Sequence, residues 1–169
     1  MTPSLERVSG KPRMEAEETH LRLGHIIGKE PPFQIYPLIQ HYCLELKEWD
    51  LANDIAGCIV RRGDTYCIGV NNRHPVTRRR FSAAHELYHY LEHRHLMQGA
   101  AMYCTRESSQ DLREWEANRF AAELLMPAIW FKYYVRFGSM QYLADTFGVS
   151  RPAVARRMQE LAIFVKLGR

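Results

Sequence analysis

Two histidines stand four residues apart in the segment 81–89, and a glutamate follows the first of them. In an α-helix, a spacing of four places two side chains on one face, so His85 and His89 can reach a single ion. Glu86 would lie at the side of that ion, where a carboxylate can hold a water molecule and take its proton. This H-E-x-x-H pattern is typical of zinc peptidases, so it predicts a zinc cofactor, hydrolysis, and Glu86 as the catalytic base.

The residues around the motif favour a partly buried helix. Neither glycine nor proline interrupts residues 80–93, and apolar side chains recur beside the histidines at helical spacing. These apolar residues are Ala83, Ala84, Leu87, Tyr90 and Leu91. The alternative, a pair of histidines that is merely exposed or hydrogen-bonded, is disfavoured because a buried helix needs a reason to carry both.

A catalytic zinc ion usually has three protein ligands and one open position, so a third ligand is expected. His93 and His95 are the next histidines in the sequence. Residue 92 is a glutamate where the metzincin pattern requires glycine, so the sharp turn that would bring a third histidine to the ion is not encoded. We therefore expect both histidines at the rim of the site or behind its ligands.

The segment 111–127 offers a better third ligand. It reads as a second helix that ends at Pro127, and Glu116 and Glu123 lie seven residues apart on one of its faces. A carboxylate oxygen is one of the usual ligands of catalytic zinc. One of the two glutamates should therefore complete the site.

Four blocks of the chain form a recognisable combination. They are residues 67–71, residues 81–89, the run E-A-N-R-F-A-A-E-L-L-M-P at residues 116–127, and residues 143–161. In these blocks the chain resembles the ImmA/IrrE family of bacterial and phage metallopeptidases. The pairing of the second block with the third is specific, whereas neither alone would be. The resemblance implies a zinc metalloendopeptidase whose metal ligands are His85, His89 and Glu116.

The resemblance also implies a partner and shows one departure. It implies a protein substrate, a helix-turn-helix repressor of a mobile element or stress response that is cut at one site. Members of the family usually have glycine before the second histidine of the motif, whereas this chain has Tyr88. A bulky side chain there would narrow the approach of a neighbouring element or add a phenol near the site, and it would leave the ligands unchanged.

The composition agrees with one small domain. Of the 169 residues, 46% are hydrophobic, which is enough for a single core, and the chain is too short for two ordinary domains. No run approaches the roughly 20 apolar residues of a membrane span, and residues 1–18 are too charged for a signal peptide, so we expect a cytoplasmic protein. The cysteines are expected to be buried thiols rather than disulfides. They are Cys43, Cys58, Cys67 and Cys104.

The expected fold is α+β, a small zincin-like metallopeptidase domain over residues 13–169 that follows a disordered lead at residues 1–12. Ahead of the zinc helix, we expect helices at 14–27 and 34–42 and strands at 43–49, 57–61 and 65–70. The last two strands would form a hairpin in a short antiparallel sheet. We expect the strand 65–70 at the edge of this sheet, where it could pair with a substrate backbone.

Residues 140–162 have the pattern of a helix-turn-helix. Gly148 ends the first helix, Ser150 can cap the second, and Pro152 stands in its first turn. The arginines of the second helix could meet DNA phosphates, and a net charge of +4 with a pI near 8.9 permits this. They are Arg151, Arg156 and Arg157. Because so few basic residues would make a weak DNA reader, we favour a packing role for this helix pair.

The alternative function is a DNA- or repressor-binding regulator that has a zinc site and no proteolysis. A structural zinc site is usually closed by four protein ligands and needs no base. The intact Glu86 therefore argues against this alternative.

Overall fold

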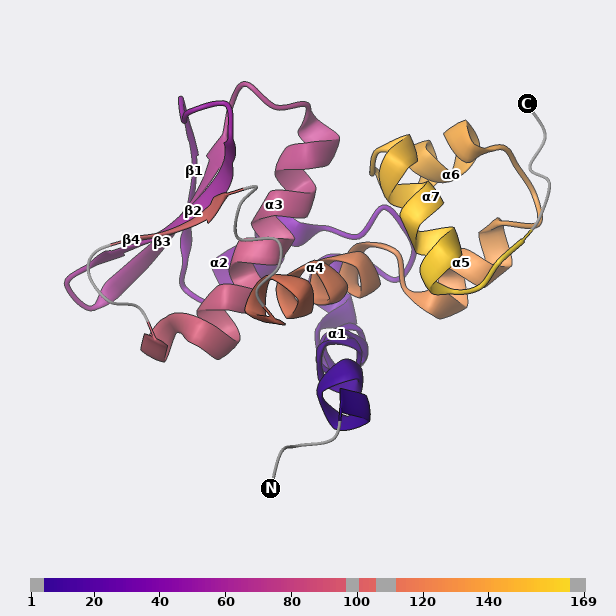
Figure 1. The fold of residues 1–169 in the computed structure, drawn as a ribbon, viewed down its shortest axis with the longest axis horizontal. Coiled ribbons are helices and arrows are strands. Elements are labelled where there is room, and N and C mark those ends of the chain that lie inside the picture. The colour runs from indigo at the N-terminus through magenta and orange to yellow at the C-terminus, as the bar shows by residue number, and fades with distance from the viewer. Residues whose placement is uncertain (1–4, 97–100, 106–111, 165–169) are drawn as a thin grey trace.

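The structure is a computed structural model, and it describes residues 5–96, 101–105 and 112–164. One small sheet lies on one side, three C-terminal helices lie on the other, and α3 (Val76–Tyr88) and α4 (Leu112–Leu125) lie between them (Figure 1). The predicted α+β class is confirmed. Among the described helices, none is long and apolar enough to cross a membrane.

The sheet has four strands in the order β1-β3-β2-β4. β1 (Glu45–Trp49) runs parallel to β3 (Thr65–Asn71), whereas β2 (Ile55–Arg62) pairs antiparallel with β3 and with β4 (Ala101–Thr105). The predicted hairpin of β2 and β3 is confirmed, but the sheet is mixed rather than purely antiparallel. The sequence analysis did not predict β4.

The strand predicted as the sheet edge, residues 65–70, lies in the interior of the sheet, so that prediction was wrong. β3 is flanked by β1 and β2, and the edges are β1 and β4. The reason lies in the burial of β3, because Cys67, Ile68 and Val70 are all buried although they do not all face one side of the sheet. A strand that is buried on both faces is typical of a sheet interior.

α3 packs against β2 and β3 and also against α4. Its buried residues include Ala83, Ala84 and Leu87, two of which are small enough to let neighbouring elements come close. The helix was predicted to continue unchanged to residue 93. Instead, its last turn is a π-helix, η1 (His89–His93), a local widening that is frequent at functional sites.

α1 (Leu5–Ile27) packs against α4 and against α2 (Ile35–His41). It begins earlier than predicted, because residues 5–12, part of the predicted disordered lead, are helical and Pro12 lies inside the helix. Residues 1–4 lie outside the described residues. Packing of one helix face against a neighbouring helix can outweigh the tendency of a proline or glycine to end a helix. Gly10 and Pro12 were therefore given too much weight in the prediction.

The C-terminal part consists of α5 (Ala128–Tyr134), α6 (Met140–Phe147) and α7 (Arg151–Glu160). The two predicted helices of the helix-turn-helix pattern are present as α6 and α7. Gly148 ends α6 with a φ of 62°, a left-handed conformation that glycine adopts easily, and the side chain of Ser150 caps α7. The local signals in this segment therefore predicted its structure well.

Arg157 connects α7 to α4 and is 1% exposed. Its guanidinium forms an ion pair with the carboxylate of Glu123, donates to the carbonyl of Met126 at 3.0 Å, and donates to Glu160 at 3.2 Å. From the sequence, Arg157 was expected to be a solvated or phosphate-binding residue. Its burial in this ion pair excludes both roles, so that prediction was wrong.

We expect the Arg157→Met variant to lose about 3–5 kcal/mol of unfolding free energy, because the change leaves the Glu123 carboxylate buried without its cationic partner. Urea unfolding followed by circular dichroism measures this loss. Arg156→Met is the matched control on the same helix, since Arg156 is exposed, and it should change stability by no more than about 0.5 kcal/mol. An Arg157→Met protein as stable as the wild type would contradict the stabilising role of the pair.

The cysteines only partly follow the prediction. Cys58 and Cys67 are buried, and burial raises the pKa of the Cys58 thiol to about 12. Cys43 is exposed, so the prediction was wrong there, because this residue lies in the turn before β1 with a φ of 56°. The side chain of Cys104 lies outside the described residues. The two buried thiols are therefore poor nucleophiles.

Candidate metal centre

Three buried side chains from two segments converge at one point: His85, His89 and Glu114. Nε2 of His85 lies 3.1 Å from one carboxylate oxygen of Glu114, and Nε2 of His89 lies 3.2 Å from the other. The two Nε2 atoms are 3.0 Å apart, and all the candidate ligand atoms lie within 4.8 Å of one another. Two imidazole nitrogens and a carboxylate oxygen form a donor set that can hold one metal ion.

The packing of α3 on α4 positions this group. His85 lies in the last turn of α3 and His89 begins η1, so the rings occupy successive turns of one face, as their spacing predicts. Glu114 lies in the first turn of α4. One and two turns later, Ala117 and Ala121 are fully buried, and their small side chains let α4 lie close to its neighbours.

The third carboxylate is not the one that the sequence analysis named. The structure brings Glu114 to the two histidines, whereas a carboxylate oxygen of Glu116 lies 3.4 Å from Nε2 of His93. Glu123, the other candidate, binds Arg157 and accepts a hydrogen bond from the backbone N–H of Ala128 at 2.8 Å. The structure therefore groups Glu114 with the two histidines, in place of the predicted Glu116 or Glu123.

The reason is the angular position of each glutamate around the axis of α4. Glu114 and Glu116 are two residues apart, which places them about 200° apart around a helix, so both cannot reach His85 and His89, and Glu116 contacts His93 one turn further on. A signal for Glu114 was available, because it continues the buried stripe of Ala117, Ala121 and Leu124 at helical spacing. The resemblance to the family had favoured Glu116 instead.

Glu86 lies beside the group and is 1% exposed. Both of its carboxylate oxygens are buried and have no hydrogen-bond partner among the described residues. Burial raises its pKa to about 8, although the charge of His85 acts in the opposite direction. A buried carboxylate without a protein partner is costly, and a catalytic role is one of the usual reasons for keeping it. This arrangement suits the catalytic role predicted for Glu86.

The backbone of β2 leaves room for this carboxylate at Gly57. A Cβ atom on Gly57 would lie only 2.9 Å from a carboxylate oxygen of Glu86 and 3.2 Å from the carbonyl oxygen of Gly69. Any side chain at this position would therefore have to push Glu86 away.

We expect Gly57→Ala to slow hydrolysis by up to about 100-fold with the metal content unchanged, because a shift of about 1 Å in a reacting group can have an effect of this size. Hydrolysis rates and elemental analysis measured on the same preparation check this. Gly24→Ala is the control, since nothing lies within 4 Å of an added Cβ there. Equal rates for the two variants would show that Gly57 does not set the place of Glu86.

The protonation states of the group suit metal binding, which requires neutral imidazoles and an ionised carboxylate. Burial lowers the pKa of His89, although its hydrogen bond to Glu114 acts in the opposite direction. Burial alone would raise the pKa of Glu114, but its hydrogen bonds to His85 and His89 outweigh this and hold the pKa well below its ordinary value. Glu114 is therefore a carboxylate at neutral pH.

Asn118 of α4 is a functional candidate that the sequence analysis missed. Its side-chain oxygen lies 3.2 Å from Nδ1 of His85, on the side of the ring away from the ligand group. A hydrogen bond of this kind fixes the orientation of a ligand histidine. The signal was present, because Asn118 stands in the E-A-N run that the resemblance used.

The two later histidines occupy different positions. His93 is buried behind His89, with their Nδ1 atoms 2.9 Å apart, which agrees with its expected place behind the ligands. Burial and the neighbouring His89 lower the pKa of His93 to about 4. His95 is exposed. Neither belongs to the group of His85, His89 and Glu114.

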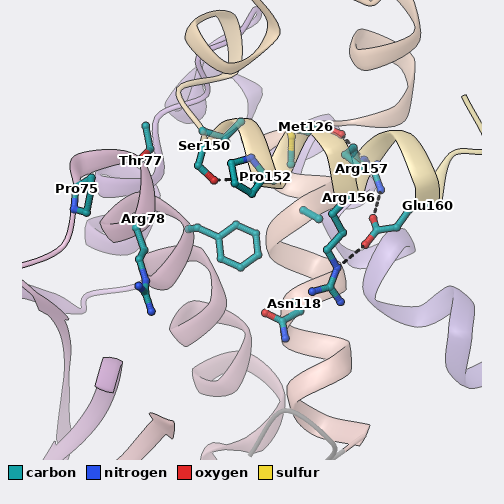
Figure 2. Close-up of a pocket in the computed structure, with 14 residues that line it drawn as sticks. Pro75, Thr77, Arg78, Asn118, Met126, Ser150, Pro152, Arg156, Arg157 and Glu160 are labelled. Carbon is teal, nitrogen blue, oxygen red and sulfur yellow. Dashed lines mark hydrogen bonds and ion pairs between the residues drawn. The ribbon is translucent and has the colours of Figure 1, made fainter. Parts of the chain in front are cut away.

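A cavity of about 470 Å³ lies between α3, α4 and α7 (Figure 2), and neither Glu86 nor any of the three candidate ligands lines it. Asn118 lines the cavity and contacts His85, so the cavity reaches the residue that orients a candidate ligand. Phe81 and Ala122 also line it, four residues before His85 and four residues after Asn118. The same two helices therefore form both the candidate metal centre and the cavity wall.

A small sheet, an H-E-x-x-H helix and a buried His-His-Glu group together define a zincin-like fold of the metallopeptidase class. The sequence model of the Peptidase_M78 family, described as the IrrE N-terminal-like domain, matches residues 48–159. The chain belongs to this family, and the predicted resemblance is confirmed.

Among solved structures, the chain is similar to a Mycobacterium tuberculosis transcriptional regulator, with a TM-score of 0.64 and 20% sequence identity. The match covers 91% of this chain and 48% of the other, so the chain spans about half the length of that protein. At this identity the likeness shows the fold alone. No curated protein sequence matches the chain.

Proposed function

We propose that this chain is a zinc-dependent endopeptidase. The observation that carries the proposal is the buried group of His85, His89 and Glu114, with the carboxylate of Glu86 beside it, which has no hydrogen-bond partner in the part of the chain that the structure describes. Three protein ligands with a neighbouring base are typical of a catalytic site, whereas a structural zinc site is usually closed by four ligands. Membership of a peptidase family supports the same proposal.

The donor set fits zinc, which accepts imidazole nitrogen and carboxylate oxygen in a site with one open position. His85, His89 and Glu114 would hold the ion. Bound there, zinc would supply a Lewis acid for the scissile carbonyl and would lower the pKa of water at the site.

The chain's own residues would manage the protons. Glu86 would accept a proton from the attacking water and return it to the departing amine, a role that needs a carboxylate without other partners. Gly57 leaves the space that this carboxylate occupies. Asn118 would keep Nε2 of His85 directed at the ligand group. Together these contacts preorganise the site before a substrate binds.

We propose that the cavity between α3, α4 and α7, which reaches the candidate metal centre only through Asn118, receives an apolar side chain of the substrate outside the cut bond. Its walls include Phe81, Ala122 and Pro152, which are apolar. Arg78 and Arg156 also line it, and Arg78 has no acidic partner among the described residues. Arg156 lies 3.5 Å from Glu160, so the guanidinium group of Arg78 is the one that would attract an acidic residue next to the apolar one. The chemistry of the cavity therefore suits a segment that carries an apolar and an acidic side chain.

The proposed substrate is a helix-turn-helix repressor, cut in the cytoplasm. The resemblance to the ImmA/IrrE family supports this substrate class. The similar mycobacterial structure is named a transcriptional regulator, and this description applies to that protein.

N-terminal proteomics of cells that express either the wild type or the Glu86→Gln variant tests the proposal. We expect a new N-terminus within a repressor, produced only by the wild type, next to an apolar residue. An Ala122→Phe variant, which would fill the cavity, should keep its zinc and lose this cut. Identical N-termini in cells with the wild type and with Glu86→Gln would contradict an endopeptidase function.

The second candidate function is a DNA- or repressor-binding regulator with a zinc site and no proteolysis. The structure leaves it little support, because Arg157 is buried and Arg156 lies 3.5 Å from Glu160, so few cations of α7 remain for phosphates. Repression that depends on the chain and survives Glu86→Gln would favour this candidate.

A further inference from the structure

A chain of buried polar contacts leads away from the metal centre behind His89. Nδ1 of His89 lies 2.9 Å from Nδ1 of His93, and Nε2 of His93 lies 3.4 Å from a carboxylate oxygen of Glu116. His89 is 2% exposed and His93 is 7% exposed. The three side chains therefore form a line from the candidate metal ligand His89, through His93, to the carboxylate of Glu116, which does not belong to the ligand group.

The chemistry of imidazole allows one consistent arrangement of protons along this line. Nε2 of His89 faces Glu114 and His85, so this nitrogen would bind the metal through its lone pair. The proton of the neutral His89 ring is then on Nδ1. Nδ1 of His93 must then accept that proton in a hydrogen bond. The proton of His93 is consequently on Nε2, which faces the acceptor oxygen of Glu116. Each donor thus meets an acceptor.

The local backbone and packing hold the His93 ring in this place. The π-helical turn η1 begins at His89 and ends at His93, and the centroids of the two rings are 5.1 Å apart. The ring of Tyr88 packs edge-on against His93 at 5.5 Å and also lies 5.1 Å from Phe120. Tyr88, which replaces the usual glycine of the family, therefore forms one wall around the His93 ring.

We propose that His93 is a positioning residue, which takes the Nδ1 proton of His89 in a hydrogen bond and is itself oriented by Glu116, so that Nε2 of His89 is held toward the metal. This inference rests on the proposed metal centre. His93 does not touch the metal or the substrate, and Glu116 acts two contacts away. Such partners behind a ligand histidine raise metal affinity by fixing the ring and its tautomer.

The affinity for zinc of the purified chain of 169 residues, measured by competition with a chromophoric chelator, tests the proposal. We expect His93→Leu to weaken zinc binding by about 10–100-fold. His93→Gln should restore most of the affinity, because its amide can accept from His89 and donate to Glu116. Glu116→Gln should have a smaller effect than His93→Leu. His95→Leu, a change at the exposed histidine, is the matched control and should bind zinc like the wild type.

Nitrogen NMR of the imidazoles gives a second readout that needs no variant. In the zinc-loaded wild type, we expect the Nδ1 atom of His93 to show the shift of an unprotonated nitrogen and its Nε2 atom that of a protonated one. The opposite tautomer would overturn the proposal. Equal affinities of His93→Leu and wild type, or equal weakening in His93→Leu and His93→Gln, would also overturn it. A wild type that binds no zinc would refute the metal centre itself, a separate and recognisable failure.

Discussion

Replacing Glu86 with glutamine is expected to slow peptide hydrolysis by about 10²–10⁴-fold while the protein keeps its zinc. Glutamine has nearly the same shape as glutamate but cannot accept the proton of the attacking water. Its side chain would occupy the same buried space beside Gly57. The rate of cleavage of a peptide that spans the cut site, together with zinc content by elemental mass spectrometry, measures both parts of this prediction.

Glu45→Gln is the matched control, because this glutamate is exposed at the start of the edge strand β1 and forms its ion pair with Lys47. It should leave both the rate and the zinc content unchanged. Hydrolysis at the wild-type rate in Glu86→Gln would exclude Glu86 as the base. Loss of zinc together with activity would make Glu86 a metal ligand instead.

The second large effect is expected for Glu114→Ala, which should abolish stoichiometric zinc binding. The variant retains only His85 and His89 near the metal, and two imidazoles do not make the three-ligand site of a zinc hydrolase. The loss of affinity should exceed the factor of about 10–100 that is typical when a residue behind a ligand is removed. Zinc content after dialysis against a weak chelator measures it.

Glu116→Ala distinguishes the structure from the sequence prediction. Because Glu116 lies beside His93, its removal should weaken zinc binding without abolishing it. Zinc that is lost in Glu116→Ala and kept in Glu114→Ala would restore the assignment made from the sequence and contradict the geometry. An equal loss of zinc affinity in both variants would also contradict the geometry.

The elements that depend on neighbouring residues were predictable. The hairpin of β2 and β3, the helix that carries His85 and His89, and the pair α6–α7 all follow from periodicity, turn residues and caps. The elements that depend on distant contacts were not. β4 was missed, and β3 was placed at an edge, because strand order is set by which segments of the chain meet in space.

For individual side chains, too, those whose environment depends on distant contacts were not predictable from the sequence. Arg157 looks like an exposed cation of a helix-turn-helix in the sequence, yet it is buried against Glu123 of α4. Its environment depends on how α7 lies on α4, which no spacing within α7 can predict. The contact of Asn118 with His85 likewise joins two helices.

The relative positions of the two histidines and the glutamate beside them could be predicted from the sequence alone, because a spacing of four on one helix places side chains on one face. The sequence also indicated the family, through the pairing of this helix with the segment 116–127. That Glu114 rather than Glu116 lies beside the two histidines follows from the tertiary structure. Both lie on α4 within one turn, and the one that meets His85 and His89 depends on the rotation of α4 against α3, which the packing of their buried faces sets.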